Sequence, residues 1–219
     1  MRDLSVTQEY VICIVDEKGK ISGLSSEKAV CFVAAAILEL RMERCIVIDA
    51  KKTSVTGSLP ADRQYLKPLY DFISQKKQMK LSKILGEYCL SLTNKRYHEL
   101  LDEVGASLVK MGLVQERKIG LLGNKKGYTP APETVRSVVE GLRSELLEEG
   151  KISEEAAALA ILLERAKCLK QYFSKFEQKE IKEKVRVLMD SPEGKLVKEI
   201  ADYIETILVI VSASGASAV

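Results

Sequence analysis

The chain has 219 residues, of which 46% are hydrophobic and 30% charged, a balance that excludes a disordered or fibrous protein. The 34 basic residues nearly cancel the 31 acidic ones, and a net charge of +3 lacks the clear basic excess of a dedicated nucleic-acid-binding protein. The length suits one generous domain, and we expect residues 1–219 to form a single one.

The cysteine and histidine content argues against a disulfide framework and a metal centre. The five cysteines form no C-x-x-C pair and are odd in number, which is typical of reduced thiols. With His98 as the only histidine, a zinc site lacks ligands, and we expect neither a metal nor a cofactor. Asp3 and Glu9 arrive too early for a signal peptide, and the apolar residues 207–219 are too few to span a bilayer. We therefore expect a cytoplasmic protein that is at most peripheral on a membrane.

The first two predicted helices form the centre of the fold. Ser5 and Gln8 make a capping box that opens a helix, and the turn at residues 16–19 ends it. Residues 29–40, AVCFVAAAILEL, are apolar on every face and carry one charge, Glu39. A helix with this pattern is buried on all sides, and it is well short of the roughly 20 residues that cross a bilayer. We expect amphipathic helices to surround it.

The remaining elements are mostly amphipathic helices. In chain order the sequence predicts a strand at 45–49, a helix carrying Tyr65, Leu69, Phe72 and Ile73, a helix at 95–111, a β-hairpin at 113–128, and helices at 133–147, 153–173, 177–189 and from 192 onward. The fold class is therefore mainly α: a single compact helical domain around a buried central helix, with a short β-strand pair and one β-hairpin.

No motif in the chain indicates catalytic chemistry. Residues 98–102, HELLD, are similar to the start of the H-E-x-x-H zinc motif, but they end in Asp102 and no third ligand is evident. The glycine-rich residues 120–127 lack the G-K-[ST] ending of a phosphate loop and lie in the predicted hairpin. We expect that the protein is not an enzyme.

The helix at 95–111 and the hairpin at 113–128 together have the outline of a winged helix, which makes DNA binding an alternative. A recognition helix approaches phosphates, and the middle of this one carries Glu99, Asp102 and Glu103. Each of these carboxylates facing DNA would lower its affinity. We therefore expect no nucleic-acid partner.

Four stretches resemble the Golgi phosphoprotein 3 family. Residues 4–19 are similar to its opening L-T-L-x-E-E, hydrophobic run and D-x-x-G, and residues 36–48 to its L-x-E-L-A-L-R-G-R-I segment. Residues 56–57 lie where its P-T-G element falls, and residues 108–114 resemble its L-V-E-K-G-V-L. Order and spacing agree over nearly the whole chain. Because the chain starts almost at the first helix, we expect a bacterial-type relative that lacks the N-terminal extension of eukaryotic members.

The resemblance implies a compact, mostly helical domain that lies on membranes. Eukaryotic members recognise phosphatidylinositol 4-phosphate and act as adaptors that sort glycosyltransferases, and the hairpin is implicated in self-association. We therefore expect a peripheral membrane-associated binding or adaptor protein.

The family's headgroup pocket is altered in this chain. The family uses one tryptophan and three arginines, and this chain has no tryptophan at all. The four positions fall here on Leu24, Val33, His98 and Leu101. A phosphomonoester needs charge-assisted donors, which the three apolar residues do not offer. Lys95 and Arg96, one turn before His98, are candidate substitutes.

Two binding hypotheses remain open for the hairpin. In the first, four basic side chains lie against anionic lipid, each contributing about 1 kcal/mol, while Leu121 or Leu122 inserts among the lipids. These four are Arg117, Lys118, Lys125 and Lys126. In the second, the hairpin pairs with a second copy of the chain through an exposed strand edge, and lipid is irrelevant.

Overall fold

A computed structural model describes residues 4–21, 27–49, 52–120 and 125–216 and shows a mainly α-helical fold with two small antiparallel sheets. The helices are α1 (Val6–Ile14), α2 (Glu27–Met42), α3 (Lys67–Ser74), α4 (Leu81–Cys89), α5 (Lys95–Lys110), α6 (Pro132–Leu147), α7 (Glu154–Arg165), α8 (Lys175–Asp190) and α9 (Lys195–Ala216), with 3-10 turns η1 (Ala61–Leu66), η2 (Leu169–Gln171) and η3 (Pro192–Gly194). The strands are β1 (Ile46–Asp49), β2 (Lys52–Val55), β3 (Met79–Lys80), β4 (Val114–Ile119) and β5 (Lys125–Pro130).

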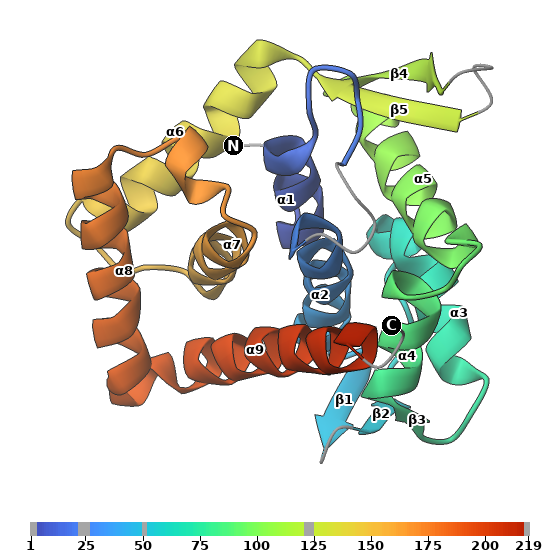
Figure 1. The fold of residues 1–219 in the computed structure, drawn as a ribbon. Coiled ribbons are helices and arrows are strands. Elements are labelled where there is room, and N and C mark those ends of the chain that lie inside the picture. The colour runs from blue at the N-terminus through green and yellow to red at the C-terminus, as the bar shows by residue number, and fades with distance from the viewer. Residues whose placement is uncertain (1–3, 22–26, 50–51, 121–124, 217–219) are drawn as a thin grey trace.

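Helix α2 is the predicted central helix, and its burial is confirmed. Every residue from Ala29 to Leu40 is at most 3% exposed, including Glu39. Helices α1, α4, α7 and α9 pack around it (Figure 1). Because Ala34, Ala35 and Ala36 have small side chains, they leave room for these neighbours. None of the described helices is both long and apolar enough to cross a membrane.

The buried carboxylate of Glu39 joins three elements. It accepts a hydrogen bond from the Thr7 backbone N–H in the first turn of α1, at 3.2 Å. It also accepts one from the Tyr65 hydroxyl and forms an ion pair with Arg63 at 3.3 Å, both from η1. A buried charge is tolerated where it is paired and hydrogen-bonded in this way. Glu39 therefore fixes α1 and η1 against α2.

The capping box that the sequence predicts for Ser5 and Gln8 is confirmed at the start of α1.

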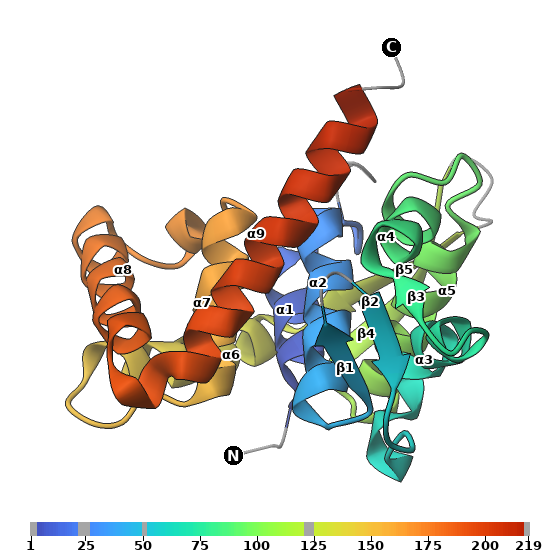
Figure 2. The same cartoon turned by 90° about the horizontal axis from the view of Figure 1, so that it is seen from below.

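Helix α9 crosses the molecule and encloses the central helix on one side (Figure 2). It packs on α2, α4, α7 and α8. Its Tyr203 ring lies 4.8 Å below the guanidinium of Arg41 on α2, and its hydroxyl donates to the Ile48 carbonyl at 3.1 Å. Glu199 forms an ion pair with the same Arg41. The C-terminal helix is thus part of the enclosure that buries α2.

Both sheets are antiparallel. Strand β2 pairs with β1 and with the two-residue β3, one strand more than the predicted pair. The predicted hairpin is formed by β4 and β5, with Glu116 opposite Tyr128. The ring of Tyr128 lies against Gly105 of α5, where an added Cβ would approach ring atoms to 2.5 Å. Gly105 therefore lets the hairpin pack directly on α5.

One predicted helix is shorter than expected. Residues 153–173 were predicted as one helix, but α7 ends at Arg165. Lys167 has a left-handed conformation (φ 59°), and the Cys168 N–H donates to the Leu163 carbonyl at 2.8 Å. This is a Schellman ending, for which glycine is the usual signal. A lysine in that position does not indicate a helix end, so the sequence did not predict one there. The turn η2 and a capping box at Ser174 then lead into α8.

Candidate functional site

The described residues at the predicted headgroup positions come from α2 and α5. Val33 is completely buried in α2, and Leu101 is 9% exposed on α5. His98 is half-buried, and its ring lies 5.6 Å from that of Tyr97, which points into the core. Leu24 lies outside the described residues. Of the three mapped positions that the structure describes, His98 alone presents a polar group near the surface.

His98 is held in its neutral form by its surroundings. Partial burial lowers its pKa, and the positive charge of Lys125 on the hairpin lowers it further, against an opposing effect of Asp102. Because both causes of the lowered pKa disfavour the imidazolium, the side chain supplies hydrogen bonds but no charge near neutral pH. Strand β5 packs on α5, which brings the charge of Lys125 within electrostatic reach of His98.

The two candidate substitutes, Lys95 and Arg96, differ in how far other side chains already pair with them. Lys95 is exposed, and no partner is recorded for it among the described residues. Arg96 stacks over the Phe72 ring at 4.3 Å and pairs with Glu87 at 3.5 Å. Lys95 begins α5, whose preceding residue Asn94 makes no side-chain capping bond. A helix N-terminus and a free ammonium group both favour an anion at this point.

The hairpin exposes the four basic residues that the sequence predicted for it. Arg117, Lys118, Lys125 and Lys126 are all exposed. Lys118 and Lys126 lie directly opposite each other on the two strands, and Lys126 also pairs with Glu116 at 3.2 Å. Leu121 and Leu122, predicted to insert into lipid, lie outside the described residues. The exposed charge of the hairpin is therefore mainly positive.

A second segment with exposed lysines, which sequence reasoning missed, lies beside the hairpin. The Tyr128 N–H donates to the Gly19 carbonyl at 3.0 Å, so residues 16–20 run along β5. Gly19 has φ +75°, and a Cβ there would approach the Tyr128 nitrogen to 2.7 Å. Lys18 and Lys20 are exposed in this segment, as is the acidic Glu17. The D-x-x-G turn was visible in the sequence, but its position against the hairpin was not.

We use the term basic face for Lys18, Lys20, Lys95, Arg117, Lys118, Lys125 and Lys126, which come from the loop after α1, the start of α5 and the hairpin. The structure thus packs the hairpin on α5 and on the loop after α1, sets of residues that the sequence left separate.

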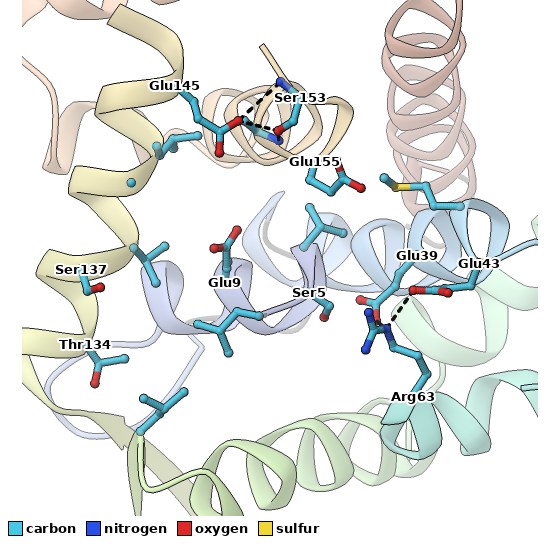
Figure 3. A pocket seen from close by; sticks show the side chains of 18 of the residues that line it. Ser5, Glu9, Glu39, Glu43, Arg63, Thr134, Ser137, Glu145, Ser153 and Glu155 are labelled. Carbon is cyan, nitrogen blue, oxygen red and sulfur yellow. Dashed lines mark hydrogen bonds and ion pairs between the residues drawn. The ribbon is translucent and has the colours of Figure 1, made fainter. Parts of the chain in front are cut away.

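The structure also contains an acidic cavity of about 940 Å³ that sequence reasoning did not find. It lies between α1, α2, α6 and α7, with η1 at one end (Figure 3). Its described lining includes the glutamates Glu9, Glu39, Glu43, Glu133, Glu145 and Glu155 and a single cationic residue, Arg63. These carboxylates come from distant parts of the chain, so no local sequence motif predicts the cavity.

Fold and surface together define a mainly α-helical domain in which a basic hairpin is packed on one helix and a buried apolar helix forms the core. The chain belongs to the Golgi phosphoprotein 3 (GPP34) family, whose family model matches residues 7–204. That family is not known as an enzyme family. A comparison with curated proteins found no match.

Proposed function

We propose that this protein binds anionic membrane surfaces peripherally through the basic face. The observation that carries the proposal is the pairing of Lys118 with Lys126 across the hairpin. Like charges directly opposite each other destabilise a strand pair, and Glu116 offsets only one of the two lysines. An anionic surface relieves this repulsion, and so the arrangement suits a partner of negative charge.

Membership of the family supports the lipid as that partner, and the altered residues suggest how the headgroup is held. In place of the family's arginines, the chain has the exposed Lys95 at the start of α5 and the exposed Lys125 on the hairpin, whose charge reaches His98. Ammonium groups bind a phosphate as point charges and without the bidentate geometry of arginine. We therefore expect weaker discrimination among acidic lipids than a dedicated phosphatidylinositol 4-phosphate pocket gives.

Vesicle flotation of the full chain tests the proposal. We compare neutral phosphatidylcholine vesicles with vesicles that contain phosphatidylserine or phosphatidylinositol 4-phosphate at matched surface charge. We expect recovery on both acidic vesicles and loss of binding as salt is raised. The double variant Lys118→Ala/Lys126→Ala removes two charges worth about 1 kcal/mol each, so its affinity falls roughly 30-fold.

The matched control is Lys151→Ala/Lys198→Ala, which removes two exposed lysines outside the basic face. Its binding stays close to that of the parent chain if the basic face is the contact. Equal recovery on neutral and acidic vesicles, or an equal loss in the control, would contradict the proposal.

Self-association through the hairpin stays a prediction from the sequence. Among the described residues no strand pairs with the outer edge of β4, which leaves that edge free for a second copy. The residues of β4 from Gln115 to Lys118 are all exposed and polar, however, a pattern that discourages edge-to-edge pairing. The DNA alternative is disfavoured on similar grounds, since Glu99 and Glu103 are exposed on α5. We therefore keep lipid binding as the proposal, with the contact made by the hairpin rather than by the acidic middle of α5.

A further inference from the structure

The acidic cavity is electrostatically unbalanced. Arg63, the one cationic residue in its described lining, is already engaged by Glu39 at 3.3 Å and by Glu43 at 2.9 Å. No cationic partner is recorded among the described residues for Glu9, Glu133 or Glu155. Glu145 accepts hydrogen bonds from the hydroxyl and N–H of Ser153, which are neutral donors. Among the described residues, the lining therefore carries more negative than positive charge.

The hydroxyl of Thr134 gives a second, independent indication that the cavity accommodates a ligand. Thr134 lines the cavity from α6, is 8% exposed, and has no side-chain hydrogen bond recorded to any described residue (Figure 3). Buried polar groups normally have a partner, and an exception calls for a ligand or an ordered water. A bound amine would donate to this hydroxyl oxygen.

The arrangement of the carboxylates excludes one obvious ligand, a metal ion. No group of three or more His, Cys, Asp or Glu side chains among residues 4–21, 27–49, 52–120 and 125–216 converges closely enough to hold one. Figure 3 shows Glu9, Glu145 and Glu155 projecting from α1, α6 and α7 at separate points of the wall. Charges that are spread out in this way match a ligand whose own positive charges are spaced along a chain.

The apolar residues of the lining indicate the chemistry of the ligand between its positive charges. Leu4, Val6, Leu113, Val138 and Leu142 line the cavity between the carboxylates. The walls are mainly helices, whose backbone groups are already hydrogen-bonded within each helix. A peptide entering the cavity would leave its own backbone without partners, whereas methylene groups need none. The volume of about 940 Å³ lies within the range of small-molecule sites.

We propose that this cavity binds an aliphatic polyamine, whose ammonium groups pair with Glu9, Glu145 and Glu155 while its methylene groups lie on the apolar wall. The site is separate from the basic face, so the proposal stands or falls independently of membrane binding.

Proton linkage offers a direct signature of such binding. Burial, followed by the charges of Glu145 and Glu155, raises the pKa of Glu9 from 4.5 to about 7. A bound ammonium group favours the ionised carboxylate and so lowers this pKa. At pH 6.5 the protonated fraction of Glu9 therefore loses its proton when the polyamine binds.

Isothermal titration calorimetry of the full chain with spermidine, at pH 7.5 and 150 mM salt, tests the proposal. We expect saturable binding of one spermidine per chain, weakened roughly 5-fold by Glu9→Gln and by Glu155→Gln, each of which removes one charge-assisted contact. The matched control is Glu154→Gln, since Glu154 is exposed on the same turn of α7 but does not line the cavity. Its affinity stays that of the parent chain.

Three further measurements separate this site from general attraction of cations. Magnesium chloride at the same ionic strength does not displace spermidine if the site is built for spaced charges. At pH 6.5 the binding enthalpy varies with the ionisation enthalpy of the buffer, and Glu9→Gln removes that dependence. A peptide rich in lysine and leucine binds more weakly than spermidine. Absence of saturable binding, equal weakening in Glu154→Gln, displacement by magnesium or tighter binding of the peptide would overturn the proposal.

Discussion

At the scale of single residues, Glu9 is the side chain whose environment most clearly opposes its charge. It lies on α1 at the acidic cavity, where burial and the carboxylates of Glu145 and Glu155 raise its pKa to about 7. The folded chain therefore holds a proton that the unfolded chain releases, between pH 4.5 and 7. The free energy of unfolding contributed by this group falls as the pH rises through that window, and the loss is complete above about pH 7.

We predict that Glu9→Gln stabilises the protein at high pH. The substitution keeps the shape of the side chain and removes the unfavourable charge, so the free energy of unfolding rises by about 2 kcal/mol at pH 8. At pH 5 the parent side chain is already protonated in the folded chain, and the gain shrinks to under about 1 kcal/mol. Urea unfolding at the two pH values measures the difference. Glu154→Gln, on an exposed carboxylate, should change little at either pH, and a gain independent of pH in Glu9→Gln would refute the assignment.

Helix endings show at the same scale why some boundaries were missed. Arg44 and Lys167 end α2 and α7 in the left-handed conformation, with φ of 57° and 59°. Glycine and asparagine adopt this conformation most readily. In a sequence they therefore predict a helix end, whereas a basic residue does not. The end of α2 was still predicted well because its apolar run stops there. The end of α7 was predicted too late in the chain because apolar residues continue to Phe173.

At the scale of elements, the packing of the hairpin on α5 depends on a single glycine. The ring of Tyr128 occupies the space beside Gly105, and its hydroxyl donates to the Asp102 side chain at 2.9 Å. Burial, followed by the hydrogen bond to Asp102, raises the pKa of Tyr128, so the hydroxyl stays a donor at physiological pH. This contact fixes the basic hairpin against the middle of α5.

We predict that Gly105→Ala destabilises the protein by about 1–3 kcal/mol, because the new methyl group overlaps the Tyr128 ring and forces the hairpin away. Weaker binding to acidic vesicles should accompany the loss, since the basic face is distorted. Chemical denaturation and flotation measure the two effects. The control is Gly86→Ala on α4, where an added Cβ meets nothing within 4 Å and helix propensity improves by up to about 1 kcal/mol. Equal stability of the two variants would contradict the packing argument.

At the scale of the whole molecule, the enclosure of α2 links the two ends of the chain. Helix α1 packs on α2, α6 and α7, and α9 packs on α2, α4, α7 and α8. The Tyr172 hydroxyl donates to the Cys13 carbonyl at 2.6 Å, which joins the segment before α8 to α1. Contacts between such distant segments favour the prediction of a single domain.

We therefore predict that the chain unfolds in one cooperative transition. Far-ultraviolet circular dichroism reports the helices, and tyrosine fluorescence reports the packing around Tyr10, Tyr97 and Tyr128, all of which are buried. The two denaturation curves should coincide, as they do for single domains of moderate size. Two separated transitions would show that the chain divides into independent units.

The sequence by itself determined the elements whose pattern is local: the buried helix at residues 29–40, the capping box at Ser5, the hairpin and its exposed charges. Neighbours within one or two helical turns, or along one strand, are enough to specify each of these. Only the tertiary structure decided that the charge of Lys125 acts on His98, that residues 16–20 run along β5, and that six glutamates line one cavity. The physical reason is that these groups are far apart in the chain and meet only once the helices pack. Their electrostatic interaction depends on a distance that no sequence pattern contains.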